Sequence, residues 1–132
     1  MKIIDAKDAI MGRLASYAAK QAMNGEDVVI VNCEQAKITG RRLDIAEHFL
    51  KSRTKVGTGQ QGPKISRLSY KIVKRAIRGM LPEHREGRGR VAWKKIKCYN
   101  GTPKEFESAE KITLIRPDKR GKFIRVSELS KL

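Results

Sequence analysis

Near the N-terminus, the apolar positions predict a strand, a helix and a second strand in succession. Residues 2–6 (KIIDA) are a short apolar run, and residues 12–23 are rich in alanine, a good helix former, before Asn24-Gly25, a typical helix C-cap. Residues 28–31 (VVIV) are continuous and β-branched, which is typical of a strand buried on both faces. This order predicts a βαβ unit with parallel strands and a right-handed crossover.

Two further helices are predicted in the middle of the chain. The first spans about residues 41–52 and should bury Leu43, Ala46 and Leu50, with Ile45 and Phe49 beside them. The second spans about residues 66–80 and is strongly amphipathic, because at 100° per residue its cations fall within one arc of about 100°. Those cations are Arg67, Lys71, Lys74, Arg75 and Arg78. The opposite side carries Leu68, Ile72, Val73, Ala76, Ile77 and Met80.

The rest of the chain predicts a loop, a basic helix and three strands. Residues 53–65 carry three glycines, a proline and three basic residues, which favours a long loop. A basic helix at 87–95 leads into a strand at 96–99. Alternating runs at 112–115 and 123–126 flank a turn-rich PDKRG segment and predict a hairpin.

Composition indicates one domain over residues 1–132 with an ordinary core. The hydrophobic fraction of 39% suffices for that core, whereas charged residues at 33% exceed the usual quarter. The apolar runs are too short for a membrane-spanning helix, and the N-terminus lacks the apolar stretch of a signal peptide. With two cysteines, Cys33 and Cys98, we expect reduced thiols in a cytoplasmic protein, which could pair only if the fold brought them together in an oxidising compartment.

Charge changes this picture, because it is concentrated in one segment. The whole chain has a net charge of +16, and residues 41–100 hold 17 Lys and Arg against 4 Asp and Glu, a net +13. A solvated surface normally mixes both signs. The segment therefore indicates a polyanion partner, of which nucleic acid is the commonest.

Catalytic and metal motifs are weak in this sequence. Gly57, Gly59 and Gly62 match G-x-G-x-x-G, but they follow a predicted helix, whereas the dinucleotide fingerprint follows a strand and opens a helix. A loop whose backbone approaches phosphates fits better, and disorder is the remaining interpretation. His48 and His84 lack zinc-ligand spacing relative to the cysteines. We expect no enzyme activity, catalytic residue, metal, cofactor or small-molecule substrate.

Three alternatives to RNA binding remain to be separated by experiment. An anionic membrane would require large apolar side chains on the cationic helix face, where none is predicted. A nucleotide-dependent enzyme would use the glycine loop, and a chromatin-type protein would prefer duplex DNA. Aromatic residues make up 5% of the chain, so recognition should rest on phosphates and shape, which suits folded RNA.

Several strings together resemble the family of large-subunit ribosomal protein thirteen, in its archaeal form. They are IIDAKDAIMGRLAS (3–16), VVIVNCEQAKITG (28–40), IRGMLP (77–82) and GRGRVAWKKIKCYNGTP (87–103), in the family's order and spacing. The resemblance implies a three-layer α/β/α fold around a mainly parallel sheet of about four strands, here with the C-terminal hairpin. It also implies binding to large-subunit ribosomal RNA (23S-type) during assembly, beside neighbouring large-subunit proteins, in the cytoplasmic ribosome.

The resemblance also implies roles for particular residues. Arg13 and Asn32 occupy family positions that shape or contact the site, and residues 79–82 form the family's turn beside Arg78. Trp93 and Cys98 replace expected aliphatic residues, which predicts core roles for both. The candidate RNA-binding residues are Arg13, Arg41, Arg42, Lys51, Arg53, Lys55, Gly57, Gly59, Lys64, Arg67, Lys71, Lys74, Arg75, Arg78, Arg85, Arg88, Arg90, Lys94 and Lys95.

Overall fold

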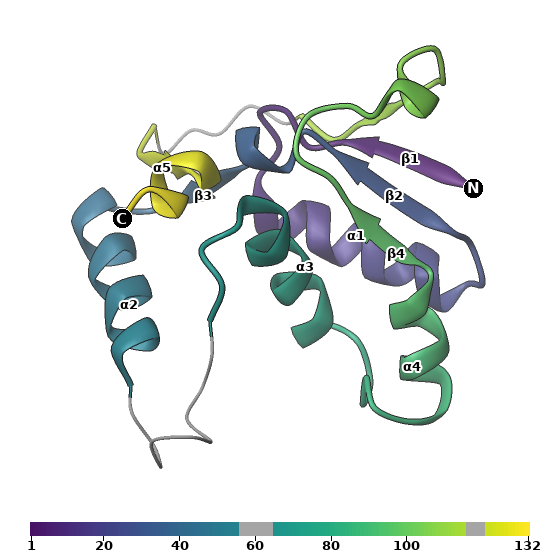
Figure 1. Ribbon diagram of the computed structural model, residues 1–132, viewed down its shortest axis with the longest axis horizontal. Coiled ribbons are helices and arrows are strands. Elements are labelled where there is room, and N and C mark those ends of the chain that lie inside the picture. Colours follow the sequence, from purple (N-terminus) through teal and green to yellow (C-terminus); the bar gives the residue numbers. More distant parts are fainter. Residues whose placement is uncertain (56–64, 116–120) are drawn as a thin grey trace.

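A four-stranded parallel sheet forms the centre of the computed structural model, which describes residues 1–55, 65–115 and 121–132 (Figure 1). The strand order is β4-β2-β1-β5, and every pair in this sheet is parallel. The strands are β1 (Lys2–Asp5), β2 (Val28–Val31), β4 (Ile96–Cys98) and β5 (Ile112–Thr113). The predicted α/β class and mainly parallel sheet are confirmed, and all four residues of β2 are buried, as expected of a central strand.

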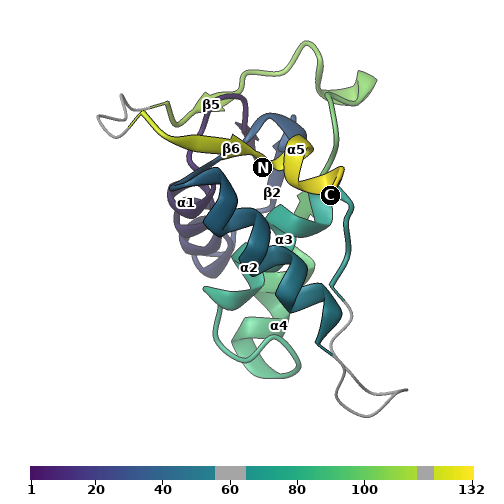
Figure 2. The same cartoon turned by 90° about the vertical axis from the view of Figure 1, so that its left-hand side faces the viewer.

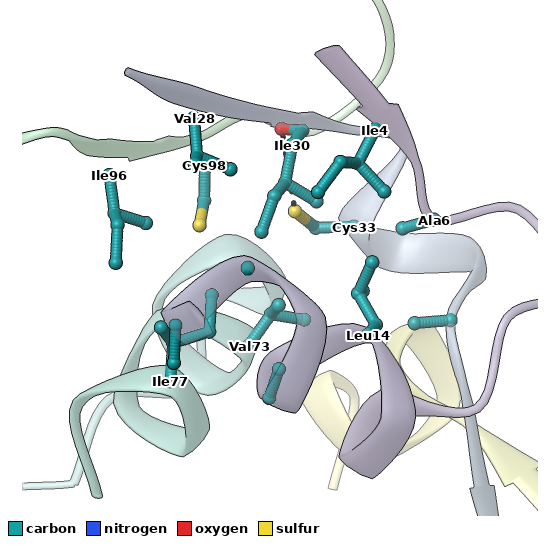
Figure 3. Close-up of a cluster of buried hydrophobic side chains, with 14 of the residues drawn as sticks. Ile4, Ala6, Leu14, Val28, Ile30, Cys33, Val73, Ile77, Ile96 and Cys98 are labelled. Carbon is teal, nitrogen blue, oxygen red and sulfur yellow. Dashed lines mark hydrogen bonds between the residues drawn. The ribbon is translucent and has the colours of Figure 1, made fainter. Parts of the chain in front are cut away.

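Three helices cover one face of this sheet (Figures 1 and 3). They are α1 (Met11–Met23), α3 (Ser69–Gly79) and α4 (Gly87–Lys94), each within three residues of its predicted bounds at either end. Leu14 and four buried alanines of α1 pack in the same core cluster as Ile4, Ile30 and Val73. The small side chains allow α1 to lie close to the strands and to α3, so the core is closely packed.

The other face of the sheet has a thinner cover. Ile3, Val29 and Val31 pack against Tyr99, Phe106 and Ala109. In this segment the chain forms a short 3-10 turn, η2 (Lys104–Phe106), which follows β4. Within the described residues, this turn and its flanking loop form the third layer, on the face opposite α1, α3 and α4.

A second, two-stranded sheet corrects the predicted C-terminal hairpin. β6 (Phe123–Arg125) pairs antiparallel with β3 (Lys37–Thr39), which follows the 3-10 turn η1 (Cys33–Gln35). The other supposed hairpin strand, β5, pairs parallel with β1 at the edge of the main sheet. The alternation of apolar and polar residues correctly indicated both strands. It could not identify the strands they pair with, because a strand shows the same alternation whichever strand lies beside it.

The helix α2 (Arg42–Thr54) lies at the end of the molecule away from the main sheet, next to β6 and the short helix α5 (Val126–Ser130) (Figures 1 and 2). Phe49 is its buried residue and packs with Ile124 and Leu129. The predicted buried face was wrong, since Leu43 is 84% and Leu50 is 41% exposed. α2 docks through Ile45 and Phe49, which are four residues apart, on the small sheet that the sequence did not reveal.

Both cysteines are free and buried on the helix-covered side of the sheet (Figure 3). The neighbouring Cys98 thiol and burial raise the pKa of the Cys33 thiol, which stays protonated at neutral pH. The core role expected for Cys98 is confirmed. None of the described helices is long and apolar enough to cross a membrane.

Candidate functional site

The helix α3 has a buried apolar face and a cationic face. Val73 and Ile77 are fully buried, and Figure 3 shows both on the side of the core. Lys71 and Arg75 are exposed on the other side. The predicted amphipathic helix is thus confirmed at its centre, whereas Leu68 and Met80, at the ends of the predicted apolar face, are about half exposed.

Arg67 lies outside this helical face, contrary to the prediction. The helix begins at Ser69, because Leu68 has extended backbone angles and serves as its N-cap. The Leu68 backbone N–H donates a hydrogen bond to Ser66 Oγ at 3.2 Å, which fixes the turn before the helix. Arg67 is exposed on this approach segment.

The cations of α3 converge on a hollow of about 270 Å³, here called the α3 hollow. Its lining consists of Ser66, Lys71, Lys74, Arg75, Arg78 and Trp93. The Lys74 ammonium lies over the Trp93 ring, 4.9 Å from its centroid, and the His84 ring approaches Trp93 edge-on at 6.4 Å between centroids. Trp93 was expected in the core, but it is half-buried and forms an aromatic wall of this cationic hollow.

The positive charge of the α3 hollow is uncompensated within the described part of the chain. The salt bridges between described residues involve the N-terminus, Lys37, Arg42, Lys51, His84 and Arg125, and none includes a Lys or Arg of α3 or α4. Low-dielectric walls around clustered like charges focus the field and concentrate counterions. The hollow is therefore suited to bind anions.

The basic segment that contains α4 extends this surface. Arg85 in the preceding turn and Arg88, Arg90 and Lys94 on the helix are exposed. Lys95 differs from them, because its ammonium donates a hydrogen bond to the Gly25 carbonyl oxygen at 2.9 Å. This hydrogen bond joins the end of α4 to the turn after α1, so Lys95 has a structural role within the protein.

The candidates on α2 mostly have partners within the protein. Arg42 pairs with Glu128 of α5, and Lys51 pairs with Glu47 at 2.9 Å. Arg53 donates to the Ile65 carbonyl oxygen and lies over the Phe49 ring, 5.9 Å from its centroid. The contact of Arg42 ties α2 to α5, whereas the Lys51–Glu47 pair lies within α2. Together these contacts leave less of the charge of α2 free for an external anion.

The remaining candidates are scattered. Arg41 and Arg42 line a hollow of about 680 Å³ with β6, and Arg13 lines another with residues 113–115. Lys55 is exposed after α2. Gly57, Gly59 and Lys64 lie outside the described residues, as does most of the loop predicted at 53–65. The first two residues of that predicted loop instead belong to the last turn of α2.

Asn32 shapes the fold at the carboxyl ends of three parallel strands. It has a left-handed backbone, with φ of 57°. Its Nδ2 donates to Asp5 Oδ1 at 3.0 Å after β1, and its Oδ1 accepts from Thr102 Oγ1 at 3.3 Å after β4. No sequence pattern indicated this network, because its members are far apart in the chain.

Asp8 joins the two sheets electrostatically. The Arg125 guanidinium, 3.0 Å from Asp8 Oδ1, holds the pKa of that carboxyl below its ordinary value, and nearby Lys37 and Lys7 lower the pKa further. Asp5 and Asp8 thus form structural contacts. No three His, Cys, Asp or Glu side chains among the described residues are placed to hold a metal ion.

A parallel α/β core and a converging cationic surface define the class: a small, strongly basic α/β protein. Residues 1–105 match the family described as ribosomal protein L13. The large ribosomal subunit protein uL13 of Thermoplasma volcanium is 42% identical, covering 99% of this chain and 96% of the relative. The uL13 protein of Methanocaldococcus jannaschii is 41% identical, covering 99% of this chain and 96% of the relative. That of Methanosarcina barkeri is 40% identical, covering 98% of this chain and 95% of the relative.

The chain therefore belongs to the ribosomal protein L13 family, as its sequence motifs predicted. The relatives named above are archaeal, in agreement with the predicted archaeal type. Members of this family are structural proteins of the translation machinery in the cytoplasmic ribosome, and this chain is not an enzyme.

Proposed function

We propose that this protein is a structural constituent of the large ribosomal subunit that binds and stabilises 23S-type ribosomal RNA during assembly. Its relatives carry the name of a large-subunit protein. The observation that carries the proposal is the α3 hollow, where Lys71, Lys74, Arg75 and Arg78 converge without a described acidic partner. Neighbouring large-subunit proteins are further partners.

Binding rests mainly on phosphate contacts and RNA shape. Each cation that neutralises a phosphate releases a condensed counterion, and this release drives association without reading sequence. The fully buried Val73 and Ile77 fix the orientation of α3. The cationic face is therefore presented on a rigid support, and a folded RNA whose phosphates match this spacing binds best.

The candidate residues contribute unequally under this proposal. The exposed cations of α3 and of the α4 segment make the primary contacts, since they have no described acidic partner. Arg42, Lys51, Arg53 and Lys95 contribute less, because each first holds a partner within the protein. Roles for Arg13, Arg41, Lys55, Gly57, Gly59, Lys64 and Arg67 remain predictions.

Co-sedimentation tests this proposal directly. The tagged protein should sediment with the large subunit and remain there through a high-salt wash, because a structural constituent is held by many contacts at once. In direct competition, folded large-subunit RNA should displace duplex DNA. Preference for duplex DNA would favour a chromatin-type role, and saturable ATP or NAD binding would favour a nucleotide-dependent protein; either result would contradict the proposal.

A further inference from the structure

We propose that the α3 hollow binds one unpaired RNA nucleotide, with its base stacked on Trp93 and its phosphate held by Lys71, Arg75 and Arg78. This inference rests on the proposed function and specifies what one part of the surface recognises. It adds a base contact to a surface otherwise explained by phosphate contacts alone.

The size of the hollow favours a single nucleotide. Its volume of about 270 Å³ lies close to the lower end of small-ligand sites, roughly 300–1,000 Å³. A double helix is far too wide to enter it, whereas an unpaired base can be turned out of an RNA loop or bulge. The hollow therefore selects for unpaired RNA at this point of the surface.

The chemistry of the lining fits the two halves of a nucleotide. Trp93 offers an aromatic face, and bases of any sequence stack on such a face. Lys71 and Arg75 are exposed beside it, and Arg78 is half-buried. These three cations can therefore bind the phosphate of the nucleotide. Ser66 adds a hydroxyl at the rim.

Lys74 connects these two contacts. Its ammonium lies 4.9 Å from the centroid of the Trp93 ring, where cation–π attraction holds it in the free protein. An incoming base replaces the ammonium on the ring. The flexible lysine stem then allows the charge to turn to the phosphate, so the cation–π contact is exchanged for an ion pair.

Trp93 is the only tryptophan of the chain, so its fluorescence reports on this hollow alone. We would titrate the protein with a short oligoadenylate and with an abasic oligoribonucleotide of equal length. Both strands carry the same phosphates, and only the first carries bases. The oligoadenylate should quench Trp93 and bind about 5- to 150-fold more tightly, the range expected for one stacked base.

Variants separate stacking from charge. Trp93→Leu should abolish the preference for oligoadenylate over the abasic strand, whereas Trp93→Phe should retain much of the preference. Binding of these variants is followed by the anisotropy of labelled strands, and thermal unfolding checks that they are folded. If Trp93→Leu fails to fold, the two titrations of the unsubstituted protein still decide the matter.

Two results would overturn the inference while the phosphate account stands: equal, salt-dependent binding of both strands, or a preference for bases that survives in Trp93→Leu. Absence of binding to either strand at low salt would instead contradict the proposed function itself. The two failures are therefore distinguishable in one series of titrations.

Discussion

Asn32 shows how a single residue can organise the edge of a parallel sheet. Its backbone adopts the left-handed region at φ of 57°, which asparagine and aspartate tolerate better than most side chains. From there its amide joins Asp5 and Thr102, and the Asn32 backbone N–H donates to the Gly101 carbonyl oxygen at 2.9 Å. The family position is thus explained by the connection of three strand ends.

Replacing Asn32 by aspartate should destabilise the protein by about 1–3 kcal/mol at neutral pH, because a donor is lost and a carboxylate is placed against Asp5. Asn32→Gly is the matched control, since it accepts the backbone conformation and loses the hydrogen bonds without adding charge. Urea unfolding should rank the unsubstituted protein first, the glycine variant second and the aspartate variant last. Equal stability of the aspartate variant and the unsubstituted protein would contradict this role.

Asp8 should make stability depend on pH in the acid range. Its pKa is below the ordinary 3.8, chiefly because Arg125 hydrogen-bonds the ionised form. A carboxyl with a lowered pKa in the folded protein contributes stability above its unfolded pKa, and that stability is lost as pH falls through the folded value. Asp8→Asn keeps a residue that tolerates the positive φ of 57°.

The stability advantage of the unsubstituted protein over Asp8→Asn should therefore be complete above about pH 4 and should shrink at lower pH. Thermal unfolding of both proteins between about pH 2 and 6 measures this difference. A difference that stays constant across this range would show that the ion pair with Arg125 does not form in solution.

At the scale of elements, glycine controls how α4 packs beneath the turn at residues 82–83. Gly89 is buried, and a Cβ added there would lie 2.5 Å from the Pro82 carbonyl oxygen and also against that of Glu83. These neighbours are backbone atoms and cannot rotate away. The close approach sets the position of α4, and with it the position of Trp93 against α3.

Gly89→Ala should destabilise the protein by about 1–3 kcal/mol through this overlap. Gly12→Ala is the matched control, because Gly12 lies in α1 and a Cβ added there would meet nothing within 4 Å. Alanine there should be neutral or should stabilise by up to about 1 kcal/mol, owing to its higher helix propensity. The midpoints of urea unfolding compare the two variants, and similar midpoints would refute the tight contact.

Elements could be predicted where local pattern decides them. The alanine-rich α1, the β-branched β2 and the amphipathic α3 each carry their periodicity within one segment. The buried face of α2 and the partner of β6 could not be predicted in this way. Both depend on β3, a three-residue strand that is too short to show a period and is defined by its pairing with β6.

At the scale of the whole molecule, the sequence located the cationic surface but not its shape. Charge counting and the helical period placed Lys71, Lys74, Arg75 and Arg78 on one face, and the structure brings all four to the α3 hollow. The place of Trp93 was missed, because it depends on contact between α3 and α4. The buried residues of α4 are Gly89 and Ala92, which are small and three positions apart. This helical spacing in the sequence could have indicated that Trp93, the next residue, lies at the edge of the buried face.

The basic residues of the protein differ in whether they have a partner within the protein. The cations of α3 and of the α4 segment are free of described ion pairs, whereas on α2 Arg42 pairs with Glu128 of α5 and Lys51 pairs with Glu47 of α2 itself. Substitution of the α3 cations should therefore weaken binding and leave the thermal midpoint nearly unchanged. A collapse of that midpoint would identify the face as structural.

The salt dependence of binding to a large-subunit RNA fragment tests the central claim most directly. With about eight phosphate contacts, log K against log salt should have a slope of roughly −6 to −7. Changing Lys71, Lys74, Arg75 and Arg78 to Gln should reduce its magnitude by about 3–4. The same change at Lys7, Lys20, Lys104 and Lys131, exposed lysines outside this face, should leave the slope nearly unaltered. A slope near zero, or an equal loss in both variants, would contradict the account.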